Sequence, residues 1–209
     1  MIKSLLRALH GPIYARRLET LSALMAGLLV EGDRVLDVGC GFGALGKAIM
    51  AADACPDGVV VEGIERNPRG DEVIPVHAYP GGRLPFDDGA FDVTILADVL
   101  HHDVDPDALL RECARVARRL VIVKDHKPEG IAGYRRICLL DWAANSGYDV
   151  KCLYQYPTLE AWRAQFRALP ATIVHEERSL DLYPAGWNFV FGGRLHYVAA
   201  LDVTTFGRA

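Results

Sequence analysis

The sequence lacks the patterns that mark disulfide-rich, metal-binding and membrane-spanning proteins. Its five cysteines are widely spaced and include no C-x-x-C pair, so we expect reduced thiols, with neither a disulfide framework nor a cysteine-based zinc site. It has no apolar run long enough to cross a bilayer. A net charge of -4 argues against a nucleic-acid-binding surface, which needs a basic patch. We therefore expect a cytoplasmic protein with no membrane partner and no nucleic-acid partner.

What the chain does have is an ordinary globular composition. Of its 209 residues, 51% are apolar and 24% are charged, and no internal repeat occurs. This composition predicts a single domain over residues 1–209. Apolar residues recur at helical spacing between residues 15 and 30, so residues 1–31 are expected to form an N-terminal helical cover over one edge of a ligand site.

The most informative segment is residues 34–46, which read RVLDVGCGFGALG. The apolar residues predict a short buried strand, and the glycines predict a tight loop that opens a helix. Exposed amides at the start of that helix favour an anionic or strongly polar group. The pattern Gly41-x-Gly43-x-x-Gly46 also fits the dinucleotide fingerprint, for which Glu65 would be the ribose acid. The loop indicates a nucleotide-like cofactor without deciding which one.

Asp37 separates the two cofactor classes. A carboxylate just before the first glycine would sit badly near a pyrophosphate, whereas it suits a cofactor with an ammonium group, such as S-adenosylmethionine. Residues 35–43 resemble the first motif of class I S-adenosylmethionine-dependent methyltransferases. Residues 84–92 and 98–102 look like the small-molecule subgroup called type 11. In this order along one chain, the three segments carry the resemblance over most of residues 30–209.

Strands and helices alternate along the chain, which predicts an α/β fold with a doubly wound, mostly parallel sheet. The last two strands have no predicted helix between them and should form an antiparallel hairpin at its edge. The resemblance implies the Rossmann-like methyltransferase sheet of seven strands in the order 3-2-1-4-5-7-6, with strand 7 antiparallel. The expected strands are residues 35–38, 59–65, 73–77, 91–97, 120–124, 172–182 and 194–203, and the expected helices are 15–30, 44–52, 106–117 and 131–145.

Cofactor-binding residues are expected beyond the carboxyl ends of the strands, where ligands bind in open α/β sheets. Glu65 would accept both ribose hydroxyls, and Arg66 would lie against the adenine. The subgroup commonly has an acid for the adenine amino group where this chain has Pro80, so we expect that contact from the backbone or from Tyr79. The full predicted set is Asp37, Gly39, Cys40, Gly41, Glu65, Arg66, Gly81, Ala97 and Asp98.

Two histidines and an acid just beyond strand ends are the candidate catalytic residues: His101, Asp125 and His126. Histidine suits proton removal from an acceptor because its pKa lies near the working pH. Adjacent residues of an extended segment point to opposite sides, so Asp125 is expected to meet His101 instead of His126. A structural network that ties loops together is the alternative. No metal is expected, because adjacent histidines diverge and no H-x-x-x-H spacing occurs.

Residues 127–170 are expected to form a helical and aromatic insertion that binds the acceptor. Its aromatic residues are Tyr148, Tyr154 and Tyr156, together with Trp142, Trp162 and Phe166, for which packing against the sheet is the favoured alternative. Residues 183–188 would either close the pocket or mediate a homodimer.

The resemblance implies transfer of a methyl group from S-adenosylmethionine to oxygen or nitrogen of a small-molecule acceptor, by direct in-line displacement. Two alternatives stay open. An NAD(P)-dependent oxidoreductase would use the same glycine loop, and a non-catalytic S-adenosylmethionine-binding protein would keep the loop without an acceptor pocket. An RNA-base acceptor is disfavoured because the N-P-P-Y type of motif is absent.

Overall fold

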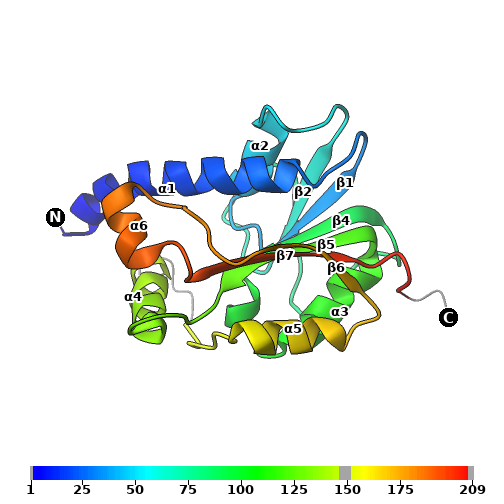
Figure 1. Ribbon diagram of the computed structural model, residues 1–209. Coiled ribbons are helices and arrows are strands. Elements are labelled where there is room, and N and C mark those ends of the chain that lie inside the picture. The colour runs from blue at the N-terminus through cyan, green and yellow to red at the C-terminus, as the bar shows by residue number, and fades with distance from the viewer. Residues whose placement is uncertain (1, 146–151, 207–209) are drawn as a thin grey trace.

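The computed structural model describes residues 2–145 and 152–206, with side chains from residue 14 onward. A seven-stranded sheet runs through the centre, in the order β3-β2-β1-β4-β5-β7-β6 (Figure 1). Strands β1 to β5 pair in parallel, and β7 is antiparallel to both of its neighbours, which confirms the predicted sheet. The strands are β1 Arg34–Val38, β2 Val60–Glu65, β3 Val76–Ala78, β4 Phe91–Ala97, β5 Ala117–His126, β6 Thr172–Glu177 and β7 His196–Asp202.

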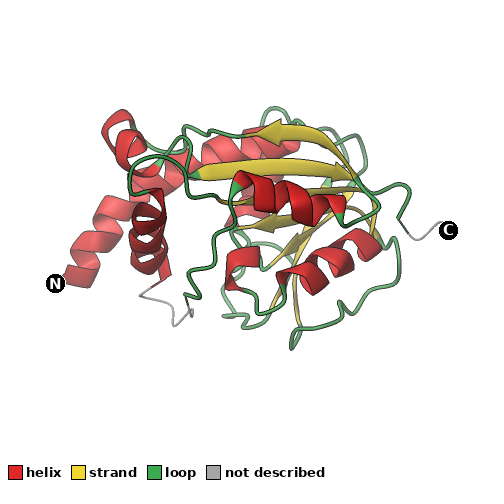
Figure 2. Cartoon of the chain, turned by 60° about the horizontal axis from the view of Figure 1, so that its bottom comes forward, coloured by secondary structure: helices red, strands yellow, loops and turns green. Residues whose placement is uncertain are grey.

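Helices cover both faces of the sheet. In Figure 1, α1 and α2 lie above the sheet, and α3 and α5 lie below it. Figure 2 agrees with Figure 1 in placing α4 and α6 beyond one end of the sheet, near the start of α1. The helices are α1 Ile2–Ala26, α2 Ala44–Ala51, α3 Pro106–Val116, α4 Gly133–Asn145, α5 Leu159–Arg167 and α6 Ala185–Phe191, with a 3₁₀ turn, η1, at Leu100–His102.

The central strands are apolar on both sides because each side packs against helices. In β1, Leu36 and Val38 belong to the core between the sheet and helices α3 and α5, while Val35 belongs to the core between the sheet and helices α1 and α2. Alternate residues of a strand point to opposite faces, so near-continuous apolar runs suit buried parallel strands. Such burial stabilises the fold by about 25 cal/mol per Å² of apolar surface removed from water.

Helix α3 begins as the sequence predicts. The Asp105 side chain accepts a hydrogen bond from the Ala108 amide at 2.9 Å, and Pro106 occupies the first turn. An N-cap acid satisfies an otherwise unpaired amide, and proline loses nothing there because its missing N–H has no partner in a first turn.

The C-terminal segment differs from the prediction. Strand β6 ends at Glu177 instead of residue 182, and helix α6 separates it from β7, so the expectation of two strands with no helix between them is wrong. Pro184 precedes the first turn of α6 with a φ of -53°, and the Trp187 and Phe191 rings stack 5.9 Å apart. These rings are four residues apart, where helix geometry brings side chains together.

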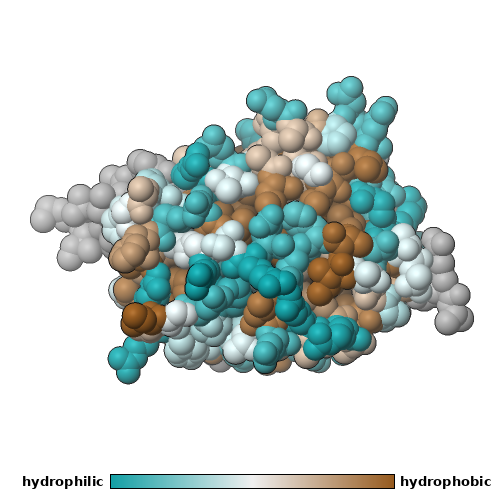
Figure 3. All heavy atoms as spheres, in the orientation of Figure 1, coloured by the Kyte–Doolittle hydropathy of each residue, from teal (hydrophilic) through white to brown (hydrophobic). Residues whose placement is uncertain are grey.

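Strand β6 forms one edge of the sheet, and charged residues line it. Glu176 pairs with Arg163 of α5 and with Arg178. Hydrophilic residues spread across the middle of the molecular face shown in Figure 3. Charges on an edge strand discourage pairing with other chains. Across the described ranges, every helix is too short or too polar to span a membrane.

Candidate functional site

The predicted site residues gather where the strand order reverses. β1 pairs with β2 on one side and with β4 on the other, so its carboxyl end marks the switch point of the sheet. Asp37, Glu65 and Ala97 all lie at the carboxyl ends of these three strands, where open α/β sheets bind their ligands.

The loop after β1 depends on its glycines. Gly39, Gly41 and Gly43 have φ values of 69°, 59° and 84°, in the left-handed region that favours glycine. A Cβ at Gly39 would lie 2.8 Å from Val99, and one at Gly43 would lie 2.4 Å from Ile74, so packing also requires these two glycines. A Cβ at Gly41 would meet nothing within 4 Å. The backbone of Gly41 is therefore the open surface of the loop.

Asp37 is a buried carboxylate at the end of β1, just before the glycine loop. Only 2% of the residue is exposed, and among the described residues its Oδ2 atom has no hydrogen-bond partner. Burial, followed by the nearby charge of Glu65, raises the pKa of Asp37 to about 7. A buried carboxylate of this kind favours a cationic ligand, because a positive group would satisfy the orphan oxygen and stabilise the charged form.

Glu65 is held beside the glycine loop by backbone amides. Its Oε2 accepts a hydrogen bond from Gly41 at 2.9 Å, and its Oε1 accepts from Arg66 at 2.8 Å. Oε1 also accepts from the Asn67 amide at 3.3 Å. Each carboxylate oxygen has two acceptor positions, so Oε2 keeps one position for a ligand hydroxyl. The bond to Gly41 ties the end of β2 to the open part of the loop.

The sequence predicts that Arg66 lies against the adenine. In the structure, Arg66 forms an ion pair with Asp103 at 2.6 Å and a hydrogen bond with Tyr79. A Cβ on Gly81 would lie 3.2 Å from the Arg66 Nε. Arg66 therefore joins the loop after β3 to the end of β2. Pro80 is exposed, whereas Tyr79 is buried.

The half-buried Cys40 directs its sulfur toward β2. A Cβ built on Gly63 would lie 2.3 Å from the Cys40 Sγ, so the thiol packs against the strand. Burial and neighbouring carboxylates raise the pKa of Cys40. A ligand contact from Cys40 would thus come from its backbone.

Asp98 has a positive φ of 59°, which is uncommon for a residue other than glycine. Its carboxylate pairs with Lys124 of β5 and with Arg17 of α1, and His126 Nε2 lies 3.4 Å away. Burial would raise the pKa of Asp98, but Lys124 and Arg17 outweigh it and hold the pKa well below its usual range. The side chain is thus occupied by protein cations, and a cofactor contact would fall to its backbone.

His101 and Asp125 meet as the sequence predicted. His101 Nδ1 lies 2.6 Å from Asp125 Oδ1, and both residues are buried. Burial lowers the pKa of His101, but Asp125 and the other carboxylates outweigh it and raise the pKa to about 10. His101 is accordingly held as an imidazolium in the ligand-free protein.

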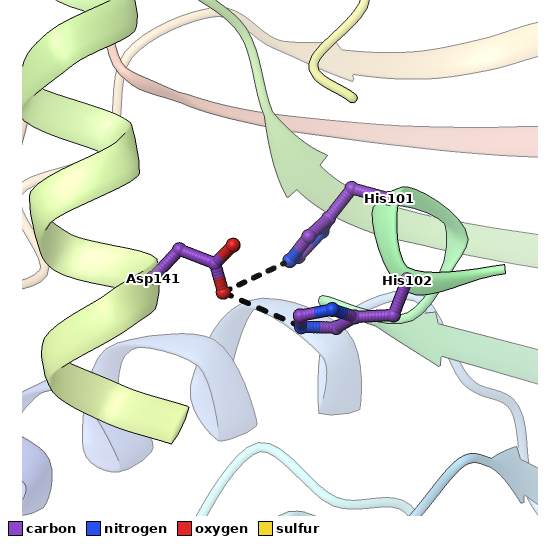
Figure 4. A group of neighbouring side chains, drawn as sticks. All are labelled: His101, His102 and Asp141. Atoms are coloured by element: carbon purple, nitrogen blue, oxygen red, sulfur yellow. Dashed lines mark ion pairs between the residues drawn. The ribbon is translucent and has the colours of Figure 1, made fainter. Parts of the chain in front are cut away.

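His101 and His102 converge instead of diverging. They lie in η1, their ring centroids are 4.0 Å apart, and both point at Asp141 of α4 (Figure 4). Their Nε2 atoms lie 3.7 and 3.4 Å from Asp141 Oδ1. The argument from divergence is wrong because it holds for extended chain, whereas these residues occupy a tight helical turn.

His126 differs sharply from His101. It is 5% exposed, and burial, followed by Lys124, lowers its pKa to about 4. Its Nδ1 atom finds no partner within the described part of the chain. The ring is neutral at physiological pH, and Nδ1 can either accept or donate a hydrogen bond, depending on the tautomer.

Sequence reasoning missed Arg17 as a site residue, and it did not predict that Lys124 pairs with Asp98 or that Asp141 meets the two histidines. Asp141 and Asn145 are one helical turn apart, which was the available signal for a shared face. Trp162 and Phe166 are buried in the core, whereas Trp142 is 56% exposed, so packing of Trp142 onto the sheet is wrong. Tyr148 lies outside the described residues.

The sheet order, the antiparallel β7 and an acid before a glycine loop at the switch point together define the class I methyltransferase fold. Residues 36–122 match a family described as a methyltransferase domain. The ubiquinone biosynthesis O-methyltransferase of Xanthomonas oryzae pv. oryzae (strain PXO99A) is 33% identical over 118 residues, covering 51% of this chain and 48% of that protein. The chain spans less than half the length of the curated relatives it matches.

Two solved structures are similar over most of the chain. Magnesium protoporphyrin IX methyltransferase from Synechocystis PCC 6803, with bound SAH, has a TM-score of 0.60 and 16% identity, covering 91% of this chain and 85% of that one. A SAM-dependent methyltransferase from Methanosarcina mazei has a TM-score of 0.62 and 16% identity, covering 86% and 96%. This likeness establishes the fold: the chain has the class I methyltransferase fold. The sequence match to the methyltransferase-domain family is confined to residues 36–122.

Proposed function

We propose that this protein transfers a methyl group from S-adenosylmethionine to oxygen or nitrogen of a small-molecule acceptor. The observation that carries the proposal is Asp37, a buried carboxylate with an orphan oxygen beside an open glycine loop. The ammonium group of the cofactor would pair with Asp37, and the ribose hydroxyls would bind Glu65. S-adenosylmethionine would supply a methyl group on a positively charged sulfur, which leaves as neutral S-adenosylhomocysteine when a nucleophile takes the methyl group.

The acceptor side of the proposal rests on His101, which follows β4, and on His126, the last residue of β5. His126 offers a neutral ring nitrogen whose pKa is about 4, below the working pH, so it would take the proton of an acceptor hydroxyl as the methyl group makes that oxygen acidic. His101, braced by Asp125, would position the acceptor. Tyr134 lines a surface cavity of about 510 Å³, and its ring lies 5.8 Å from that of Tyr156. A small molecule would approach the histidines from this side.

The curated relatives support an oxygen acceptor, since the matching proteins are named as O-methyltransferases of ubiquinone biosynthesis. The match covers only part of those proteins, so we infer from them only the chemical class of the acceptor, which is a small molecule with a nucleophilic oxygen. The homodimer and the cytoplasmic location expected from the sequence stay predictions.

Calorimetry tests the cofactor directly. We expect S-adenosylmethionine and S-adenosylhomocysteine each to bind with one site per chain, because both carry the ammonium group that Asp37 would hold. NADH, which brings a pyrophosphate, should give no heat of binding. Binding of NADH with no response to the other two ligands would favour the oxidoreductase alternative and overturn the proposal.

Turnover tests the role of His126. A panel of phenols, catechols and amines would be screened for S-adenosylhomocysteine release. For any acceptor found, His126→Gln should lower kcat by roughly 10²–10⁴ while the affinity for S-adenosylmethionine stays unchanged. His77→Gln is the matched control, because His77 is exposed and pairs with Glu62 on the β2–β3 edge. Normal kcat in His126→Gln would remove that residue from the mechanism.

A further inference from the structure

His101, His102 and Asp141 place three metal-ligating atoms within reach of one point. The atoms are the two Nε2 nitrogens and one carboxylate oxygen, and all lie within 4.8 Å of one another. The residues come from two elements far apart in sequence, η1 and α4, and their side chains point toward one another (Figure 4). His101 and Asp141 are buried, the His102 side chain is 18% exposed, and Asn145 Nδ2 lies 3.4 Å from His102 Nε2.

The spacing fits a small ion. A tetrahedral ion with bonds of about 2.0–2.1 Å has ligands about 3.3–3.4 Å apart along each edge. The distances from Asp141 Oδ1 to the Nε2 atoms of His101 and His102 are 3.7 and 3.4 Å. Asp141 Oδ1 is thus within a few tenths of an ångström of the required spacing from both nitrogens. The two Nε2 atoms lie within 4.8 Å of each other, and small rotations of the imidazole rings would bring them to the same spacing.

A second layer of hydrogen bonds orients the three groups. Asp125 engages Nδ1 of His101 at 2.6 Å, which leaves Nε2 directed at Asp141. The Tyr156 hydroxyl donates to Asp141 Oδ2 at 2.5 Å, and Asn145 Nδ2 donates to Oδ1 at 2.7 Å. A carboxylate behind a ligating histidine is the usual support of protein metal sites, because it fixes the ring and raises its basicity.

Charge balance favours a divalent ion. Two carboxylates, Asp125 and Asp141, face this pair of imidazoles, and a doubly charged cation neutralises both. Two nitrogen ligands and one oxygen ligand suit Zn²⁺ and similar first-row ions and suit Mg²⁺ poorly. The ion would take the place of a proton between the imidazole and carboxylate groups.

We propose that His101, His102 and Asp141 bind one divalent transition-metal ion of the Zn²⁺ class, with Asp125 and Tyr156 as positioning residues. Three protein ligands leave a fourth position for water or for an oxygen of a small molecule. The inference does not rest on the proposed function, because metal binding is measured without cofactor or acceptor. It replaces the sequence-based expectation of no metal.

The test uses the full-length protein after chelator treatment, titrated with Zn²⁺ by calorimetry and with Co²⁺ by visible absorption. We expect one ion per chain and the intense visible bands of four-coordinate Co²⁺. His102→Gln removes a ligand whose side chain is partly exposed, so the fold should survive, and it should weaken Zn²⁺ binding at least about 100-fold. Tyr156→Phe removes only a hydrogen bond to Asp141 and should weaken binding about 10- to 100-fold.

Two controls keep the result specific. His77→Gln removes an exposed histidine far along the sheet and should bind Zn²⁺ like the wild type. The Cys152 thiol hydrogen-bonds with Asp141, and thiols bind Zn²⁺, so Cys152→Ser is titrated as well. The proposal is overturned if wild type and His102→Gln bind alike, or if Cys152→Ser alone abolishes binding. Failure of this site would leave the calorimetry with S-adenosylmethionine unaffected, so the two proposals fail separately.

Discussion

The ionised form of Asp37 lowers the stability of the ligand-free protein, and the same charge would bind a cationic ligand. A carboxylate buried without a full set of partners disfavours its own ionised form, which is why the pKa of Asp37 rises to about 7. The folded protein without ligand therefore bears a cost whenever Asp37 is charged. A bound cation would remove that cost, so the same residue would weaken the free protein and strengthen the complex.

Asp37→Asn should reveal this cost as a pH-dependent gain in stability. The pKa is about 7 in the folded protein against an ordinary value of 3.8, so the unfolded chain releases the proton first as pH rises. The cost starts near pH 4, grows up to pH 7 and is constant above it. From pH 5 to pH 8, the stability of Asp37→Asn relative to wild type should rise by about 2–3 kcal/mol. Urea unfolding at both pH values measures the change.

The comparison across pH is needed because a buried amide adds its own constant offset. Asp87→Asn is the control, since Asp87 is exposed, and its effect should stay within about 0.5 kcal/mol at both pH values. A pH-independent difference between Asp37→Asn and wild type would show that Asp37 titrates normally. Asp37→Asn should also lose S-adenosylmethionine binding, because a neutral amide cannot form an ion pair with the ammonium group of the cofactor.

At the scale of elements, the parts that could be predicted are those whose signals are local. The apolar run of β4 and the Asp105 cap of α3 depend on neighbours in the sequence, and the structure has both. The glycine loop belongs to the same class, because a positive φ requires glycine almost regardless of the rest of the fold. The conformation of the glycine loop was predictable for this reason.

Elements decided by tertiary packing were harder to predict. Helix α6 spans only the seven residues AGWNFVF, and these are apolar on most positions, so they show no apolar stripe opposite a polar face by which a surface helix is normally recognised. Strand β6 has an intermediate and exposed pattern that gives no clear end point. The turn η1 spans three residues, too few for any periodicity, yet it decides where His101 and His102 point.

The candidate catalytic residues are brought together by contacts that span the whole molecule. Asp98 pairs with Arg17, 81 residues earlier, and His101 with Asp125, 24 residues later. The Asp125 contact was predictable because parallel strands β4 and β5 end at the same edge. The Arg17 contact was not, because the apolar spacing of residues 15–30 indicates which face of α1 packs on the sheet but not which strand end lies beside its polar residues. Long-range ion pairs of this kind join the N-terminal helix to the site.

Arg17→Ala tests whether that link supports the fold, with Arg16→Ala as its neighbour control. Arg17 is 19% exposed and pairs with Asp98, whereas Arg16 is 53% exposed and pairs with Glu19 on the same helix. Losing Arg17 leaves Asp98 with Lys124 as its remaining strong partner, so we expect a loss of about 1–3 kcal/mol in unfolding free energy.

Arg16→Ala should cost no more than about 0.5 kcal/mol, because exposed ion pairs contribute little. Hydrogen exchange adds a regional readout, since amides of α1 should exchange faster in Arg17→Ala if the ion pair anchors the helix. Equal destabilisation by the two variants, with unchanged exchange in α1, would mean that apolar packing through Leu21 and Met25 alone holds the helix on the sheet. In that case Arg17 would serve Asp98 electrostatically without anchoring the N-terminal helix.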